Sequence, residues 1–594
     1  MNTALSNPRV LLLAMPWNRW DYPSIQVGLL KAYLCAEGIA AQAGYPYVDL
    51  ARRLGSEGYN KIADKLPPLL AESFFTMGIL DGDAHLDAWL AEVVETEELD
   101  HEQVLSVVHS VRDFLSELFD SVSWDDVDVV GFTCTFNQVY ASIALAQRIK
   151  LHHPKVRIVF GGSNFHGKLG RAFLENYQCI DCVISGPGEQ ALLNYVCNDT
   201  SERVYIDGSM YSSITPVIPD YEEYFNCLPA DWRSMASLVA IASRGCHYGR
   251  CVFCAQNLEP GCYKYPPEWV HTCLNELVRR HGALRVEFAD TAFPVSLLDC
   301  GDKDMLGKGS LGLFSEFTAG LSEYQYDQIS SAGFDIIQVG IESFHSGILR
   351  RMRKPADLLT NVQCLKLAAE RGINVVYNLI LDFPSTTAVD IEEMLRLLEL
   401  IFHLPPPTSL ISFQLQYNAP ILKLGDAYGI TDIRPHHHYQ WLDARFDAGK
   451  MVPFYFEFKN KSPIPTYLLE QVHSACERWH EHYNRATTQL NCRSEGDSLL
   501  VFDRRGDTDK IHEVKGVAAS IINRTSRPIL ERKLRNEYSS DKSFDYTLNQ
   551  LIHLGLVLRD SGKLLALPMR LLPTNRPKLN ALESYFSPEL FSVL

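Results

Sequence analysis

The stretch LVAIASRGCHYGRCVFC, residues 238–254, contains the pattern that decides the fold of the middle of this chain. Its first part, Leu238 to Ala242, is a short apolar run, which is typical of a strand buried on both faces. Directly after it, on a glycine-containing loop, come three closely spaced cysteines: Cys246, Cys251 and Cys254. Three thiolates on one loop can ligate three irons of a [4Fe–4S] cluster and leave the fourth iron open. The segment therefore predicts a buried strand that ends in a metal-binding loop.

A structural zinc site is the alternative for the same loop. Zinc in structural sites is tetrahedral and takes four protein ligands, so three cysteines alone do not complete it. The nearest further donors are His247 and Cys262, and neither completes the set convincingly. The sequence favours the iron–sulfur cluster and leaves zinc open.

Strands and helices alternate on the C-terminal side of this loop. Apolar runs predict strands at 285–289, 312–317, 336–341, 374–381 and 409–416, with helices between them that include 269–280 and 361–371. Together with the strand at 238–242 they make six strand–helix units, which predicts an open, partial (β/α)6 barrel. Functional residues in such barrels lie at the carboxyl ends of the strands.

The N-terminal third shows the same alternation in a different arrangement. Apolar runs predict strands at 10–15, 127–132, 156–160 and 182–185, interrupted by a helical insert at about 56–120. Alternating strands and helices predict a parallel, doubly wound, Rossmann-like sheet, which binds ligands at the carboxyl ends of its strands. Polar and glycine-rich turns follow the strands at those ends, so we expect a shared pocket there.

These patterns divide the chain into four parts. We predict a Rossmann-like domain at 1–205, a linker at 206–233, the barrel at 234–430 and a smaller α+β domain at 431–594. The last part ends in a predicted hairpin at 555–567 preceded by helices, an order typical of a winged-helix-like module. That domain is expected either to grip a substrate peptide or to seal the mouth of the barrel.

Composition limits the classes of partner. The net charge of −17 disfavours a nucleic-acid backbone as the main partner, because phosphate binding needs a basic surface. No apolar run reaches the ~20 residues that span a bilayer, and the first residues lack the layout of a secretory signal. We therefore expect a cytoplasmic protein that binds neither nucleic acid nor membrane.

The cysteine loop resembles that of the radical S-adenosylmethionine enzymes, although four residues separate the first two cysteines where the family usually has three. The resemblance implies that residues at later strand ends hold S-adenosylmethionine: Asp290, Glu316, Glu342 and Ser343. The segment from Leu379 to Thr387 resembles the adenine-flanking motif of the family, but Asp382 and Thr386 replace its usual Gly and Glu.

The N-terminal domain resembles the cobalamin-binding domain of cobalamin-dependent radical enzymes, and within them the branch that methylates ribosomally made peptides. The alternative is a Rossmann-like domain that has lost its ligand or binds another. The resemblance implies contacts to cobalamin from residues at the strand ends: Trp17, Gln26, Thr133, Thr135, Gln138, Gly161, Gly162, Ser163, Asn164, Gly186, Gly188 and Glu189.

The resemblance also implies the reaction. The reduced cluster would cleave S-adenosylmethionine to a 5′-deoxyadenosyl radical, and methylcobalamin would methylate an unactivated carbon. The substrate would be a peptide, or else a small natural-product intermediate, and flavodoxin or ferredoxin would supply electrons. A cobalamin-binding radical enzyme that rearranges a small molecule without methylating it, and a non-catalytic zinc-stabilised scaffold, are the alternatives.

Two features lie outside this scheme. The run His436-His437-His438 is interpreted as a solvated loop, with metal binding as the less favoured alternative. The alternation of Phe454, Phe456 and Phe458 predicts the inner face of a strand, which could also wall a substrate channel.

Overall fold

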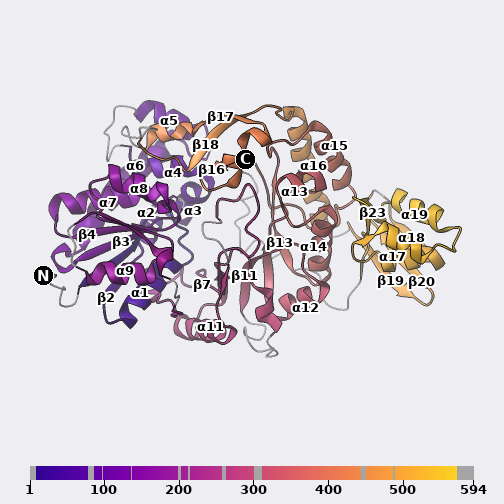
Figure 1. Ribbon diagram of the computed structural model, residues 1–594, viewed down its shortest axis with the longest axis horizontal. Helices are drawn as coiled ribbons and strands as arrows, with labels where there is room; N and C mark the ends of the chain where they lie inside the picture. The colour runs from indigo at the N-terminus through magenta and orange to yellow at the C-terminus, as the bar shows by residue number, and fades with distance from the viewer. Residues whose placement is uncertain are drawn as a thin grey trace.

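The computed structural model describes residues 8–77, 86–96, 98–135, 137–198, 202–211, 215–256, 262–299, 311–442, 450–485, 488–506 and 508–570. Figure 1 shows three parts side by side, with the N-terminal sheet at one end, the barrel strands in the middle and helices α17 to α19 at the other end. None of the described helices is long and apolar enough to cross a bilayer.

The N-terminal domain is built on a six-stranded sheet in the order β2-β1-β3-β4-β5-β6, and every neighbouring pair is parallel. Its strands are β1 (Arg9–Ala14), β2 (Ala40–Gly44), β3 (Val129–Thr133), β4 (Arg157–Gly161), β5 (Cys182–Ser185) and β6 (Val204–Asp207). Its connecting helices include α1 (Ile25–Ala36), α7 (Val139–His152), α8 (Lys168–Asn176) and α9 (Glu189–Cys197). The predicted doubly wound sheet is confirmed.

Both edge strands escaped sequence reasoning. β2 has the sequence AAQAG and β6 has VYID, and neither is a run of buried apolar residues. Edge strands are covered on fewer sides than central ones, so their sequences lack the continuous apolar signal. β6 extends past residue 205 into the predicted linker, where α10 (Glu222–Cys227) also forms. Lys31 on α1 joins this region to the domain through ion pairs with Asp220 and Glu223.

The helical insert follows α2 (Pro46–Leu54) and covers one side of the sheet (Figure 1). It contains α3 (Ser56–Asn60), a π-helical turn (Lys61–Lys65), α4 (Pro68–Ser73), α5 (Leu86–Val94) and α6 (His101–Ser121). Asp100 starts α6 with a capping box that it forms with Gln103. The fully buried Trp89 and Phe74 pack edge to face inside the insert.

The central part is an open parallel barrel. Five strands pair in the order β13-β12-β11-β10-β7, and β14 pairs with β15. Their bounds are β7 (Leu238–Ala240), β10 (Arg285–Phe288), β11 (Gly312–Phe317), β12 (Phe334–Val339), β13 (Asn374–Val376), β14 (Asn378–Ile380) and β15 (Ser409–Ile411). The outer helices are α11 (Pro267–His281), α12 (Glu323–Ser331), α13 (Ser346–Arg351), α14 (Leu358–Glu370) and α15 (Ala388–Leu398).

Two of the predicted barrel strands are divided in the structure. The predicted strand 374–381 breaks at Tyr377 into β13 and β14, and a bridge from Glu342 to Leu379 joins the second half to the end of β12. The predicted strand 409–416 continues from β15 into β16 (Leu415–Gln416), which belongs to another sheet. Six parallel positions remain, as the partial barrel requires.

The C-terminal part carries three small sheets. β16 pairs antiparallel with β18 (Tyr455–Asn460), which pairs with β17 (Ile430–Pro435), and α16 (Thr466–Asn484) follows. The second sheet contains β19 (Leu490–Glu495), β20 (Ser498–Asp503), β21 (Lys510–Lys515) and β25 (Met569–Arg570). The third contains β22 (Ile529–Leu530), β23 (Val557–Asp560) and β24 (Lys563–Ala566), beside α17 (Gly516–Arg524), α18 (Glu531–Glu537) and α19 (Phe544–His553). The antiparallel pair β23–β24 confirms the predicted hairpin, whereas the winged-helix assignment stays a prediction.

Candidate active site

The cysteine loop leaves the barrel at the carboxyl end of β7, where a short β8 (Ser243–Arg244) pairs with β9 (Tyr263–Lys264). All three loop cysteines are partly buried. Three cysteines on one loop can ligate three irons of a [4Fe–4S] cluster, whereas a structural zinc site needs a fourth protein ligand.

Asp290 holds the start of the loop. Its carboxylate accepts hydrogen bonds from Ala242 N at 3.0 Å and from Ser243 Oγ at 2.5 Å, and only 2% of the residue is exposed. Burial raises the pKa of this carboxyl to about 6, against the effect of these hydrogen bonds. The contact between Asp290 and S-adenosylmethionine that the resemblance implies stays a prediction; in the structure the carboxylate is enclosed and hydrogen-bonded to the first residues of the loop.

Further hydrogen bonds fix the second half of the loop. Val252 N donates to Met352 O at 3.1 Å, and Ile421 N donates to Val252 O at 2.8 Å. The Tyr248 hydroxyl donates to Arg353 O at 2.6 Å. The segment between the cysteines is therefore held against the end of α13 and is not a free surface loop.

An ion pair lies beside the cysteines. Lys354 Nζ donates to Glu342 Oε1 at 3.1 Å, and both side chains are largely buried. Burial raises the pKa of Cys251 to about 11, while the nearby Lys354 ammonium opposes this rise. A Cβ atom at Gly340 would lie 2.7 Å from Lys354 Nζ and 2.9 Å from Glu342 Oε1, so a larger residue there would displace the ends of both side chains.

The other two predicted S-adenosylmethionine contacts differ from each other. Ser343 is 2% exposed, and its hydroxyl accepts a hydrogen bond from His345 N at 3.2 Å, so it supports the turn after β12. Glu316 on β11 accepts from Gln338 Nε2 at 3.2 Å. Burial and the neighbouring carboxylates of Glu342 and Glu287 raise the pKa of Glu316 to about 7. Glu316 can therefore hold a proton near neutral pH.

A cavity of about 420 Å³ lies between the N-terminal sheet and the cysteine loop. Nine of the predicted cobalamin contacts line it: Gln26, Thr133, Thr135, Gly161, Gly162, Ser163, Gly186, Gly188 and Glu189. They come from the carboxyl ends of β3, β4 and β5 and from the start of α1, as a doubly wound sheet predicts. Glycines at several of these strand ends bring backbone close to the cavity, which suits a broad, flat ligand such as a corrin ring.

The opposite wall of this cavity comes from the barrel, and sequence reasoning missed it. Five residues next to the cluster loop or at the end of β10 form this wall: Ile241, Arg244, Gly245, Gln256 and Ala289. Arg244 also forms an ion pair with Glu189 at 2.5 Å. Because Gly245 is adjacent to Cys246, a ligand in this cavity would lie directly beside the cluster loop.

Comparison of the sequence with known proteins finds distant relatives, and no protein-family model matches the chain. An uncharacterized methyltransferase of Pyrococcus horikoshii is 25% identical over 298 residues, which cover 46% of this chain and 64% of that protein. The anaerobic magnesium-protoporphyrin IX monomethyl ester cyclase of Rubrivivax gelatinosus is 23% identical over 372 residues, 57% of this chain and 63% of that protein. The chain thus spans less than two thirds of either curated relative.

Comparison of structures gives wider coverage. The cobalamin-dependent S-adenosylmethionine radical enzyme OxsB, with aqua-cobalamin bound, matches with a TM-score of 0.51 and 14% identity, over 80% of this chain and 67% of OxsB. The radical S-adenosylmethionine methyltransferase TsrM from Kitasatospora setae, with cobalamin and a [4Fe–4S] cluster bound, matches with the same score and identity, over 80% of this chain and 91% of TsrM. This chain has the fold of the cobalamin-dependent radical S-adenosylmethionine enzymes.

Three predicted cobalamin contacts lie away from the cavity of this radical-enzyme fold. Trp17 is 4% exposed, and its Nε1 donates to Ala71 O at 2.6 Å within the insert. Gln138 donates through Nε2 to Met15 O at 3.0 Å and so braces the loop after β3. Asn164 lines a separate small cavity beside α8. The structure does not bring these side chains to the ligand pocket.

A second cavity, of about 560 Å³, lies at the carboxyl ends of the last barrel strands. Asp382, Ser412 and Phe413 line it from the ends of β14 and β15. Phe456 and Phe458 line it from β18, whereas Phe454 lines the small cavity beside α8. Two of the three alternating phenylalanines therefore wall a cavity, and Asp382 is tied to the backbone because it accepts from Phe413 N at 2.5 Å.

Proposed function

We propose that this protein is a cobalamin-dependent radical S-adenosylmethionine C-methyltransferase. The observation that carries the proposal is the cavity shared between the N-terminal sheet and the barrel. Its glycine-rich floor contains nine predicted corrinoid contacts, and its opposite wall includes Gly245, the neighbour of Cys246. The similarity to a Pyrococcus horikoshii methyltransferase, and to the OxsB and TsrM structures with bound cobalamin, supports the proposal.

The cofactors would supply the difficult chemistry, because a reduced cluster can cleave S-adenosylmethionine and cobalamin can carry a methyl group. The protein's own residues bind and orient these groups. Cys246, Cys251 and Cys254 hold the cluster, while Asp290 fixes the first residues of the loop. Glu342 and Lys354 form a neutral pair beside the cysteines, so the buried loop does not gain an unpaired charge.

The cavity walls would exclude water from the reacting groups. Apolar side chains from the N-terminal domain line it, among them Leu12, Ile25 and Leu29, and Ile241 lines it from the barrel. Radical intermediates react readily with other molecules that enter a site, and a closed apolar site prevents such side reactions. Glu316, whose pKa burial raises to about 7, is placed in the barrel to hold a proton during turnover.

For the substrate we propose a peptide, with a small natural-product intermediate as the second candidate. The cavity of about 560 Å³ at the barrel mouth supports a substrate side chain with apolar surface, because Phe413, Phe456 and Phe458 line it. We further propose a cytoplasmic enzyme that receives its electrons from flavodoxin or ferredoxin.

Product mass separates this proposal from a non-methylating radical rearrangement. Methylation adds one methylene unit to the substrate, whereas a rearrangement leaves the mass unchanged. A product of unchanged mass, formed together with 5′-deoxyadenosine, would show that the enzyme rearranges its substrate and does not methylate it.

Anaerobic reconstitution separates the proposal from a zinc-stabilised scaffold. We expect the wild-type chain to bind about four irons, to bind a corrinoid and to form 5′-deoxyadenosine from S-adenosylmethionine under reduction. Replacing Cys246, Cys251 and Cys254 with alanine should abolish that product, while the exposed Cys197→Ala control should keep it. A colourless protein that takes up zinc on these cysteines and binds no corrinoid would refute the proposal.

A further inference from the structure

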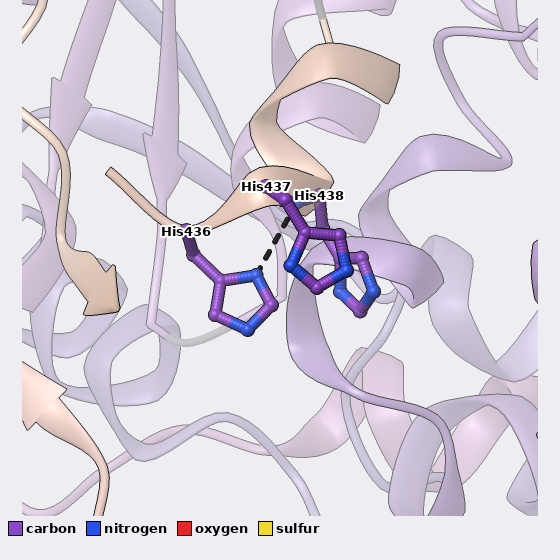
Figure 2. A group of neighbouring side chains, drawn as sticks. All are labelled: His436, His437 and His438. Atoms are coloured by element: carbon purple, nitrogen blue, oxygen red, sulfur yellow. Dashed lines mark hydrogen bonds between the residues drawn. The ribbon is translucent and has the colours of Figure 1, made fainter. Parts of the chain in front are cut away.

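Three consecutive histidines gather at a place remote from the cysteine loop. His436 precedes the 3-10 helix His437–Trp441, and all three rings lie on the same side of this turn (Figure 2). The ring centroids are 4.2–4.6 Å apart, and three ligand nitrogens lie within 4.8 Å of one another. Sequence reasoning interpreted this run as a solvated loop, but His438 is only 8% exposed.

Two of these imidazoles converge on one carboxylate oxygen. His437 Nε2 lies 3.1 Å and His438 Nε2 lies 2.9 Å from Glu92 Oε1, and Glu92 is on α5 of the N-terminal insert. Two nitrogens and one carboxylate oxygen thus meet at a single point from parts of the chain far apart in sequence. Two imidazoles and one carboxylate form a known ligand set for zinc, which keeps its fourth position for water or substrate.

The groups behind these three atoms have the arrangement expected of a second coordination shell. Trp441 Nε1 donates to Glu92 Oε2 at 2.5 Å, which leaves Oε1 to face the imidazoles. His437 Nδ1 contacts the Glu457 carboxylate, whose other oxygen accepts from Arg434 Nε at 2.8 Å. A metal-bound histidine usually donates its other ring N–H to a carboxylate in this way.

The second imidazole lacks an outer hydrogen-bond partner of this kind among the described residues. Nδ1 of the buried His438 has no hydrogen-bond partner in the part of the chain that the structure describes. Its other ring nitrogen, Nε2, contacts Glu92 Oε1, which His437 also contacts. His436 Nδ1 instead accepts a hydrogen bond from His438 N at 3.3 Å, the dashed line in Figure 2, and so caps the turn.

We propose that His437, His438 and Glu92 bind a divalent transition-metal ion, zinc in the first instance, at a site separate from the cluster. Ligand bonds of about 2.1 Å would bring the three atoms roughly 3.4 Å apart, close to their present separations from Glu92. Imidazole and carboxylate ligands suit zinc and its first-row neighbours.

Such an ion would join the N-terminal insert to the wall of the substrate-side cavity. α5 carries Glu92, whereas His436 and His438 line the cavity of about 560 Å³ next to Glu457. His437 and His438 also line an open cavity beside α5, through which an ion can enter. The metal would fix this wall in place whatever reaction the barrel performs, so the inference does not depend on the proposed methyl transfer.

The test uses the full chain without a histidine tag, with its cluster reconstituted anaerobically so that the cysteines are occupied. We expect about one zinc per chain after gel filtration, by mass spectrometry of the metal content. Cobalt substituted for this zinc should show ligand-field bands without a thiolate charge-transfer band. Zinc added to chelator-treated protein should raise the melting temperature.

Two variants and a control keep the test decisive. Glu92→Gln preserves the size of the side chain and should weaken zinc binding at least tenfold, and His437→Ala with His438→Ala should abolish it. His109→Ala, at an exposed position on α6, should bind zinc as the wild type does. Absence of zinc from the wild-type protein, or full retention of zinc in both variants, would overturn the proposal.

Discussion

Replacing Asp290 with alanine removes the acceptor that holds the start of the cluster loop. Ala242 N and Ser243 Oγ both donate to this carboxylate, and Ala242 and Ser243 are 0% and 1% exposed. A buried donor left without an acceptor costs about 1–3 kcal/mol. Two such donors give a local destabilisation of roughly 2–6 kcal/mol for Asp290→Ala. Asp290→Asn keeps one acceptor oxygen, so about half of this loss is expected.

Hydrogen exchange at the loop measures this local effect directly. A loss of 1–3 kcal/mol corresponds to about 5- to 150-fold faster exchange, so we expect an increase in that range for the peptide covering 238–254 in Asp290→Asn. Iron bound per chain after reconstitution should fall in the same order, with alanine below asparagine. The affinity of S-adenosylmethionine for those molecules that keep their cluster should stay at the wild-type value.

Thr525→Val is the matched control, because the Thr525 hydroxyl is also buried and donates to Ile521 O at 2.7 Å, but on α17. Thr525→Val should leave both the rate of cluster assembly and the hydrogen exchange of the loop unchanged. Unchanged loop exchange in Asp290→Ala, together with weaker binding of S-adenosylmethionine, would show that Asp290 contacts the ligand and would refute the positioning role.

Three further predictions concern the cavity and the barrel. The pKa of Glu316 in the folded protein is about 7, above its usual value, so the stability that Glu316 contributes at low pH is lost as pH rises through 7. This loss is worth about 3 kcal/mol. Glu316→Gln should remove it, which thermal unfolding compared between pH 5 and pH 8 would show. Arg244→Met leaves Glu189 without its partner and should lower the free energy of unfolding by about 1–3 kcal/mol, together with the melting temperature and the fraction of corrinoid retained. An equal loss in Glu189→Gln would show that the pair acts as a unit. Gly161→Ala places a methyl group on the cavity floor, 3.4 Å from Ile184 O, and should weaken corrinoid binding in a spectroscopic titration at unchanged stability. Gly58→Ala, on α3, is the control: its added methyl would lie 4.0 Å from Leu54 Cβ, away from the cavity, and should leave corrinoid binding unchanged.

The fold was largely predictable because its central strands carry a strong local signal. β1, β3, β4 and β5 are nearly all buried, and their apolar runs stand out from the helices around them. The edge strands β2 and β6 were not predictable, because each is recognised only through the neighbour it pairs with. The break at Tyr377 between β13 and β14 was not predictable either, because the residues on both sides of it form one continuous apolar run in the sequence.

The ligand cavity was predictable on one side only. Residues after the strands of a doubly wound sheet fall at one edge by topology, and nine of twelve predicted contacts indeed line the cavity. The opposite wall depends on how the barrel docks on the sheet, which no local pattern encodes. The role of Arg244 could have been predicted, because an arginine two residues before the first cysteine needs an acidic partner near the loop.

Polar residues at strand ends have two uses that sequence alone does not separate. A carboxylate or amide there can face a ligand, or it can satisfy the backbone donors that a turn leaves unpaired. In the structure Asp290, Ser343 and Gln138 are each at most 4% exposed and hydrogen-bond to their own or a neighbouring loop, as the second use requires. Glu189 and Thr135 line the cavity although their residue types are no more distinctive. Burial decides between the two uses, and burial is set by the packing of whole domains. Substituting an enclosed polar residue should therefore speed hydrogen exchange in its loop, whereas substituting a cavity-lining residue should weaken the binding of a ligand.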